Sequence, residues 1–290
     1  MVVERWNTHR STANVHGTKE VRVSKGKVLV VGSNATKIEV QGGYGPTGNY
    51  LNETVVPVWE LRDGGYDIVF ATPTGAKPHI DEASDAAVHF GGDEATWRRA
   101  QKFFAEDPAM NNVHTLRAVI DSGLDNYAGV FVPGGQAPVV DLMQDPALGE
   151  ILRYYHAKGT PTAFLCHGPI ATIAAMPKAK EFRAALVAGD TRKAAELAKG
   201  WQYAGYRMTI FSNSEEKWVE NDILHASMLF HVADALEIAG GDVSVAPVDF
   251  EPNVTEDREL ICGQNPRSDH KVGTILVAAL DRKAATITSP

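Results

Sequence analysis

The chain alternates between short apolar runs and longer stretches in which apolar residues recur every three or four positions. Short apolar runs that stop at or near turn-forming residues predict buried strands. These runs are KVLVVGSNAT, YDIVFATPTG, YAGVFVPGG, TPTAFLC, YRMTIFSN and RELICGQNP. Because helical stretches separate them, the pattern predicts a doubly wound α/β fold, with a mostly parallel sheet covered by helices on both faces.

Helices are expected between these strands and after the last one. The first begins near Asn49 and stops at RDGGY. The others are expected over VDLMQDPALGEILRYYHAKG, GPIATIAAM, HASMLFHVADALEIAGG and SDHKVGTILVAALDRKA. The segment KIEVQGGYGPTGN, directly after the first strand, is expected to be a glycine-rich loop.

One domain over residues 25–290 is expected, preceded by a flexible arm over residues 1–24. Two excursions interrupt the rhythm of strands and helices. Residues 75–112 are interpreted as a flap with a helix in DEATWRRAQKFFAED, and residues 177–204 as an Ala/Lys-rich helical insertion. With 290 residues, 44% of them hydrophobic, the chain can bury a sizeable core.

Composition narrows the class of protein. The net charge is −8 and no Lys/Arg cluster stands out, so no nucleic acid partner is expected. No apolar run reaches the length of about 18 residues that spans a bilayer, and the polar N-terminus lacks the apolar core of a signal peptide, so no membrane partner is expected either. Two cysteines cannot form a disulfide framework, which favours a reduced, cytoplasmic protein.

Cys166 stands where a predicted strand meets a predicted helix. Gly168 permits a close backbone approach there, and Pro169 suits the first helical turn. This order of strand, nucleophile and helix is similar to the elbow that carries the serine of α/β-hydrolases. A helix N-terminus favours an anion, so a lowered thiol pKa is expected. The alternative is an inert buried thiol, which is the favoured interpretation of Cys262.

Next to this cysteine, His167 is a candidate base, and a third group has to orient its imidazole. Glu215 or Glu216, in IFSNSEEKW after the following strand, could supply that carboxylate at the same sheet edge. The alternatives are a surface histidine and ordinary acidic residues in the first turn of a helix.

Two further features point to the same edge. Gly134 and Gly135, in FVPGGQAP, can present backbone N–H groups to an oxyanion, or form only a tight turn. Glu53, in the first turn of the first helix, could share a proton with Cys166 as a general acid or base. Its alternative is a surface contact with the helix dipole.

On these residues the chain resembles the ThiJ/PfpI superfamily, and especially its heat-inducible branch with glyoxalase III and holding-chaperone activity. The matching segments are TGNYLNETVVPV, GYDIVFATPTG, YAGVFVPGGQAPVVDL, FLCHGP and DRELICGQNP. They spread over most of residues 27–282. The resemblance implies a flavodoxin-like fold and an enzyme that needs no glutathione, nucleotide or redox cofactor.

The resemblance also implies a role for each matching residue. These are the nucleophile Cys166, its neighbouring base His167, the triad acid Glu216, the thiol-bonded Glu53 and the oxyanion-site glycines Gly134 and Gly135. The implied reaction adds the thiolate to the aldehyde of methylglyoxal, isomerises the hemithioacetal and hydrolyses the thioester to lactate. Repair of early methylglyoxal adducts on proteins or nucleotides would use the same residues.

The chain departs from the metal site of some members, which uses two histidines and a carboxylate near the first helix. Arg62 stands where the first histidine is expected, and an arginine does not ligate zinc, so no metal site is predicted. The flap residues His79, Asp81, Glu82 and His89 are interpreted as solvated loop residues rather than as metal ligands.

Other functions remain open. A different cysteine-dependent hydrolase or hydratase, such as an amidohydrolase or an isonitrile hydratase-like enzyme, could use the same elbow. A holding chaperone could bind clients through Trp97, Phe103 and Phe104 of the flap, although their spacing also fits a buried helix face. A class I glutamine amidotransferase is disfavoured because Phe164 replaces the first glycine of G-x-C-x-G. The expected partners are a small aldehyde substrate and a second copy of the chain in a homodimer.

Overall fold

A computed structural model of the protein describes residues 23–288. Within this range seven strands form the central sheet, in the order β10-β11-β7-β6-β1-β4-β5. The strands are β1 (Lys27–Val31), β4 (Asp67–Thr72), β5 (His114–Thr115), β6 (Tyr127–Val132), β7 (Thr162–Leu165), β10 (Val254–Asp257) and β11 (Leu260–Gly263). All neighbours pair in parallel except β10 and β11. The predicted doubly wound, flavodoxin-like α/β fold is confirmed.

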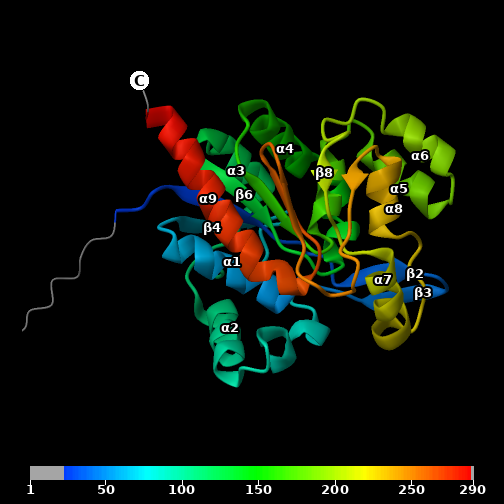
Figure 1. Ribbon diagram of the computed structural model, residues 1–290, viewed down its shortest axis with the longest axis horizontal. Helices are drawn as coiled ribbons and strands as arrows, with labels where there is room; N and C mark the ends of the chain where they lie inside the picture. The colour runs from blue at the N-terminus through cyan, green and yellow to red at the C-terminus, as the bar shows by residue number, and fades with distance from the viewer. Residues whose placement is uncertain (1–22, 289–290) are drawn as a thin grey trace, which may run out of the picture.

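Helices cover both faces of this sheet because its central strands are apolar on both sides (Figure 1). The α-helices are α1 (Leu51–Asp63), α2 (Glu94–Glu106), α3 (Leu116–Asp121), α4 (Pro146–Lys158), α5 (Ala179–Val187), α6 (Thr191–Leu197), α7 (Asn213–Val219), α8 (Val232–Ile238) and α9 (Asp269–Thr288). Helices α1 and α9 pack together on one face, whereas α3 and α4 cover the other. None of the helices between residues 23 and 288 has the length and apolar run needed to cross a bilayer.

Several local expectations were wrong. The glycine-rich loop after β1 is a hairpin of β2 (Lys37–Val40) and β3 (Gly43–Pro46). The strand expected in YRMTIFSN shrinks to β8 (Arg207–Met208), which leaves the main sheet and pairs with β9 (Asp242–Val243). Its remainder turns toward the elbow, where the Phe211 N–H donates to the carbonyl of Cys166 at 3.1 Å.

The predicted flap helix is confirmed as α2, and it lies beneath α1 on the side away from the sheet (Figure 1). The rings of Trp59 and Phe103 join the two helices at 6.3 Å, edge to face. Arg62 of α1 donates to both carboxylate oxygens of Asp107 at 2.6 and 2.8 Å. Phe103 is therefore part of the buried helix face rather than an exposed contact. The expected N-terminal arm, apart from residues 23 and 24, lies outside the described residues.

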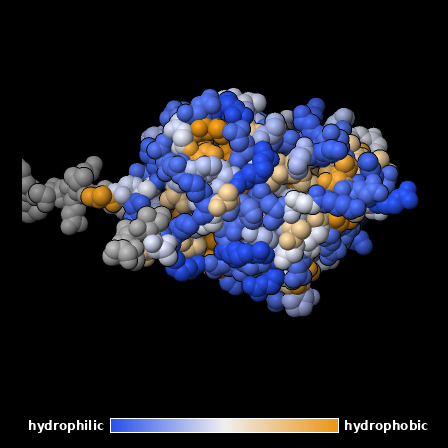
Figure 2. Space-filling view, turned by 90° about the horizontal axis from the view of Figure 1, so that it is seen from above, coloured by the Kyte–Doolittle hydropathy of each residue, from blue (hydrophilic) through white to orange (hydrophobic). Residues whose placement is uncertain are grey.

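The face of the molecule seen in Figure 2 is mostly hydrophilic, with apolar residues scattered between polar ones. That distribution agrees with the net charge of −8. Large exposed hydrophobic side chains in the described residues include Tyr44, Val88 and Trp218.

Candidate active site

Cys166 lies at the carboxyl end of β7, with its backbone in the left-handed region at φ 60°. Two hydrogen bonds fix it there. Its N–H donates to the carbonyl of Gly263 at 2.8 Å, and its own carbonyl accepts from Phe211. A non-glycine residue held in this conformation stores about 1–3 kcal/mol, which is typical of functional sites. The chain leaves the elbow as the 3₁₀ segment η6 (Gly168–Ala175) rather than the expected α-helix.

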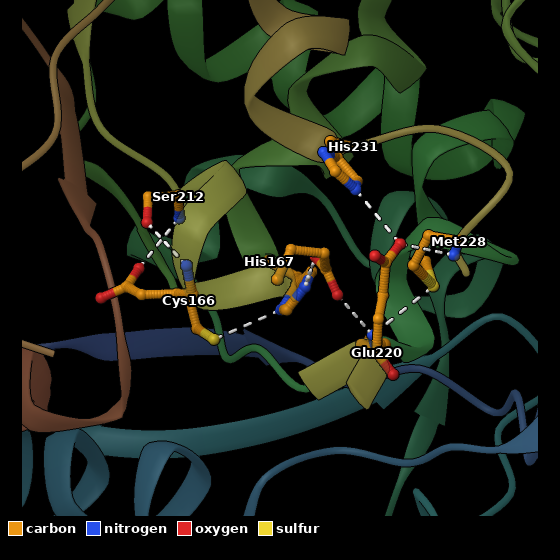
Figure 3. A network of polar contacts seen from close by, with 9 residues as sticks. Cys166, His167, Ser212, Glu220, Met228 and His231 are labelled. Carbon is orange, nitrogen blue, oxygen red and sulfur yellow. Dashed lines mark hydrogen bonds and ion pairs between the residues drawn. The ribbon is translucent and has the colours of Figure 1, made fainter. Parts of the chain in front are cut away.

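The imidazole of His167 contacts Cys166, as Figure 3 shows, and on its other side it contacts Glu216. Its Nδ1 lies 3.3 Å from Sγ, and its Nε2 lies 2.6 Å from Oε2 of Glu216. With the proton on Nε2 donated to the carboxylate, Nδ1 is free to accept the thiol proton. Both the imidazole and the carboxyl are buried, so the sequence candidates Cys166, His167 and Glu216 lie together in one hydrogen-bonded chain.

A capping box at the start of α7 aims Glu216 at this histidine. The side chain of Ser212 accepts from the N–H of Glu215, and the Glu215 carboxylate accepts from the N–H of Ser212. This fixes the first turn, so the next residue, Glu216, points toward His167. Of the two carboxylates that the sequence offered, Glu215 is held by the cap and Glu216 contacts the imidazole.

Glu53 approaches the thiol from α1. Its Oε2 accepts from the N–H of Gly134 at 3.0 Å, whereas its buried Oε1 has no hydrogen-bond partner among the described residues. Burial raises the pKa of Glu53 to about 8, although hydrogen bonds with Cys166 and Gly134 oppose the rise. At neutral pH the carboxyl therefore carries a proton that it can donate.

The thiol pKa moves in the direction opposite to the expected one. Burial raises the pKa of Cys166 well above its ordinary value, and the neighbouring carboxyls of Glu53 and Glu215 raise it further. A backbone hydrogen bond from Gly135 acts the other way but is outweighed. The resting site therefore holds a neutral thiol, because desolvation exceeds the dipole effect that the sequence suggested.

The two glycines of VPGG have different surroundings. The N–H of Gly134 is already engaged by Glu53, so it does not face an open oxyanion position. A Cβ at Gly134 would lie 2.5 Å from that carboxyl and 2.6 Å from the Cβ of Cys166. Gly135 has φ 83° and directs its N–H at the sulfur. Of the pair, Gly135 is the donor next to the reacting atom.

Gln136, which the sequence analysis did not single out, completes the network. Its Nε2 donates to Oε1 of Glu216 at 2.7 Å and lies 3.6 Å from the sulfur of Met228. Burial alone would raise the pKa of Glu216, but the charge and hydrogen bond of His167, together with this amide, lower it. In the sequence, the one signal that could have identified Gln136 was its place directly after the glycine pair in VPGGQAP.

Glu220, which contacts His231, holds the backbone of Met228 in place. Oε1 of Glu220 accepts from the N–H of Met228 at 2.7 Å and lies 3.1 Å from Nε2 of His231 (Figure 3). Glu220 opens the π-helical turn η7 (Glu220–Leu224), a rare form that often occurs near functional sites. The loop that carries Met228 is thereby pinned against Gln136.

The thiol and the imidazole open into a cavity of about 1100 Å³. The flap contributes His89, Phe90 and Arg99 to its lining, and α7 contributes Trp218. The flap residues considered as metal ligands do not gather: Nε2 of His89 bonds the carbonyl of Ala83 at 3.0 Å. Within residues 23–288 no group of three or more His, Cys, Asp or Glu side chains could hold a metal ion. With Arg62 bound to Asp107, the residues do not fit the metal site of some relatives.

The strand order and the cysteine elbow define a flavodoxin-like α/β protein with a thiol at the carboxyl edge of its sheet. Residues 48–185 match the model of the DJ-1/PfpI family, in line with the resemblance seen in the sequence. Over 264 residues it is 25% identical to the protein/nucleic acid deglycase HchA of Staphylococcus aureus, covering 87% of this chain and 79% of that one.

Two solved structures have the same fold. Glyoxalase III from Candida albicans is 20% identical with a TM-score of 0.67, over 88% of this chain and 97% of that one. The rapid encystment protein REP24 of Francisella tularensis is 23% identical with a TM-score of 0.68, over 88% and 99% of the two chains.

The expectation that nucleic acid plays no part was wrong, because curated relatives are named protein/nucleic acid deglycases. A negative net charge disfavours only recognition of nucleic acid through a basic surface. An enzyme that removes a small adduct needs to admit only the modified group to its thiol, so an acidic chain is compatible with such a substrate.

Proposed function

We propose that the protein is a glutathione-independent glyoxalase, a lyase that converts methylglyoxal and related small α-oxoaldehydes to 2-hydroxy acids. The observation that carries this proposal is the hydrogen-bonded chain from Cys166 through His167 to Glu216, with the protonated Glu53 on the other side of the sulfur. Such an arrangement can move protons on both sides of a carbon bound to the sulfur.

The first step is addition of the thiol to the aldehyde. Sγ of Cys166 attacks the aldehyde carbon while its proton passes to Nδ1 of His167, and Glu216 stabilises the imidazolium. The aldehyde oxygen becomes an alkoxide next to the N–H groups of Gly135 and His167, and a proton from Glu53 completes the hemithioacetal.

The second step moves hydrogen from one carbon to the next. The Glu53 carboxylate, which the first step leaves unprotonated, takes the proton from the sulfur-bearing carbon while the imidazolium of His167 protonates the neighbouring carbonyl oxygen. The hydroxyl on the sulfur-bearing carbon then gives its proton back to His167, and Glu53 returns a proton to the neighbouring carbon. The product is a thioester of lactate on Cys166. Water then cleaves the thioester and releases lactate with the free thiol, so the overall reaction adds one water and needs no oxidant or reductant.

A deglycase activity is the second candidate, favoured by the name of the relatives. In an early adduct, the carbon that was the aldehyde carries a hydroxyl and an amine nitrogen. Attack by Cys166 on that carbon with protonation and loss of the amine gives the same hemithioacetal. The later steps are then identical, so both activities depend on the same four side chains.

The test is turnover of methylglyoxal without glutathione by the wild type and by Cys166→Ser. We expect lactate to appear as the aldehyde disappears in the wild type, and Cys166→Ser to lower kcat/KM by about 10³ or more. Cys262→Ser is the matched control, because that buried thiol lies in β11 outside the cavity lining. Loss of aldehyde without lactate would indicate thiol scavenging and contradict the proposal. In that case amides and isonitriles become the substrates to try on the same elbow.

A further inference from the structure

Aromatic rings line one side of the cavity from the imidazole to the solvent. The ring of Phe211 lies 4.6 Å from that of His167, and Phe250 lies 6.1 Å from Phe211. Trp218 follows at 5.5 Å from Phe250, edge to face, and is 46% exposed. We call Phe211, Phe250 and Trp218 the aromatic wall; all three line the cavity that contains Cys166.

The wall is held in place at a cost in backbone strain. Phe250 has φ 62°, a conformation in which a bulky residue is a genuine outlier. Its N–H donates to Oε1 of the fully buried Glu215 at 2.7 Å. Strained residues persist where the surroundings over-determine them, and they cluster at ligand sites.

Glu215 is itself saturated by hydrogen bonds. Besides Phe250, it accepts from the N–H of Ser212 and from the side-chain amides of Gln264 and Asn265, at 2.9 to 3.0 Å. One buried carboxylate thus connects the cap of α7, which carries Trp218, to the strained Phe250. This shared anchor sets the spacing of the two outer rings of the wall.

Other parts of the lining add further apolar side chains. Val56 and Trp59 of α1 and Phe90 of the flap also line this cavity. The cavity of about 1100 Å³ is at the upper end of the size of pockets for drug-sized ligands. Methylglyoxal, with five non-hydrogen atoms, leaves most of that apolar space to water.

We propose that the site is built for α-oxoaldehydes that carry a flat aromatic group, which packs against the aromatic wall while the aldehyde reaches Cys166. This deepens the proposed function and rests on it for the chemistry. The reaction balances as before: phenylglyoxal plus one water gives mandelate, as hydrogen moves from the aldehyde carbon to the neighbouring carbon. Aromatic groups favour edge-to-face or offset contacts with ring centroids 4.5–7 Å apart, the spacing that the wall itself uses.

The test compares initial rates with phenylglyoxal and methylglyoxal, before phenylglyoxal modifies arginines. Two variants truncate the wall: Trp218→Ala, at a half-exposed position, and Phe250→Gly, in which glycine accepts φ 62° without strain. Each should lower kcat/KM for phenylglyoxal about tenfold more than kcat/KM for methylglyoxal. Tyr44→Ala, at an exposed aromatic outside the cavity lining, should change neither value. Equal effects of both wall variants on the two substrates would overturn the inference.

A binding measurement separates this inference from the proposed function. In Cys166→Ser, which lacks the nucleophile, calorimetric titration compares the products mandelate and lactate. Mandelate should bind at least tenfold more tightly, and Trp218→Ala in the same background should remove that difference. If the wild type turns over neither aldehyde but mandelate still binds preferentially, the proposed chemistry fails and the aromatic wall stands. Equal affinities for mandelate and lactate would contradict the inference that the aromatic wall binds the aromatic group.

Discussion

Gln136 decides which oxygen of Glu216 is available to His167. By occupying Oε1, its amide leaves Oε2 for the imidazole, and the sulfur of Met228 limits where the amide can turn. This makes Gln136 a positioning residue, since it acts through Glu216.

Replacing Gln136 by leucine should lower kcat for methylglyoxal about tenfold. KM should change little, because the variant loses the orientation of the base but keeps the contacts with the substrate. Rescue is expected in Gln136→Asn only if the shorter amide still reaches the carboxylate. Steady-state kinetics measure both, and Gln144→Leu, at an amide outside the cavity, serves as the control. A change confined to KM would contradict the positioning role.

Glu53 should give the activity an alkaline limit. Since burial raises its pKa to about 8, the carboxyl is protonated at neutral pH and becomes an unfavourable anion next to the sulfur above that pH. We expect kcat/KM of the wild type to fall as pH rises through about 8. Glu53→Gln should lower activity at pH 7 by about 10²-fold, and its kcat/KM should no longer fall at alkaline pH. Profiles between pH 6 and 9.5 measure this, and an unchanged limb in the variant would assign it to another group.

The same carboxyl should make stability depend on pH. The unfolded carboxyl ionises near pH 4.3, whereas the folded one ionises near pH 8. The stability that Glu53 contributes is therefore full below about pH 4 and is lost as pH rises through 8. The free energy of unfolding of Glu53→Gln, relative to that of the wild type, should therefore rise by a few kcal/mol between pH 5 and pH 8.5. Urea denaturation at each pH measures this difference. A difference that does not vary with pH would show that Glu53 ionises normally.

The sequence was enough to predict most of these side chains, but it did not predict their protonation states. Cys166, His167, Glu216 and Glu53 are recognisable because short segments with clear strand or helix signals carry them. The thiol pKa was expected to fall because a helix start follows it, yet desolvation depends on everything packed around the sulfur. Gln136 escaped for the same reason: its partners Glu216 and Met228 come from segments 80 and 92 residues away.

At the scale of elements, predictability follows the local strength of each pattern. The strands β1, β4, β6 and β7 are apolar runs buried on both sides, and all were predicted. The two-residue strands β5, β8 and β9 were missed or misplaced, since their pairing depends on neighbours rather than on their own residues. The β2–β3 hairpin was predicted to be a loop, because its glycines hide the alternation of apolar and polar residues that is typical of strands.

The contact between α1 and α9 depends on a glycine. A Cβ at Gly273 of α9 would lie 2.8 Å from the Cβ of Glu60 and 3.1 Å from the Cα of Pro57, both on α1. Gly273→Ala should therefore destabilise the protein by about 1–3 kcal/mol, although alanine is about 1 kcal/mol better than glycine in a helix. Thermal unfolding measures this, with the exposed Thr274→Ala as control on the same helix. A stabilised Gly273→Ala would show that the two helices can separate freely.

At the scale of the whole molecule, the cavity is the feature that sequence did not predict. Its lining comes from α1, the flap, the loop after β6, the elbow, α7 and the segment before α9. Each of these segments was recognisable alone, but the volume they enclose depends on how all of them pack. The choice between small and aromatic substrates is therefore made at this scale.

A homodimer remains a prediction from the resemblance. Sedimentation at micromolar concentration should give twice the chain mass of 31.3 kDa. A species with the mass of one chain at every concentration would contradict it.

The neutral, buried state of Cys166 has a consequence for how long the protein lasts. Hydrogen peroxide oxidises thiolates to sulfenic acid far faster than it oxidises thiols. Because burial raises its pKa, the sulfur of Cys166 is less often in the oxidisable thiolate form than a free thiol is. The protein should therefore keep its activity through peroxide exposures that inactivate enzymes with permanently ionised cysteines.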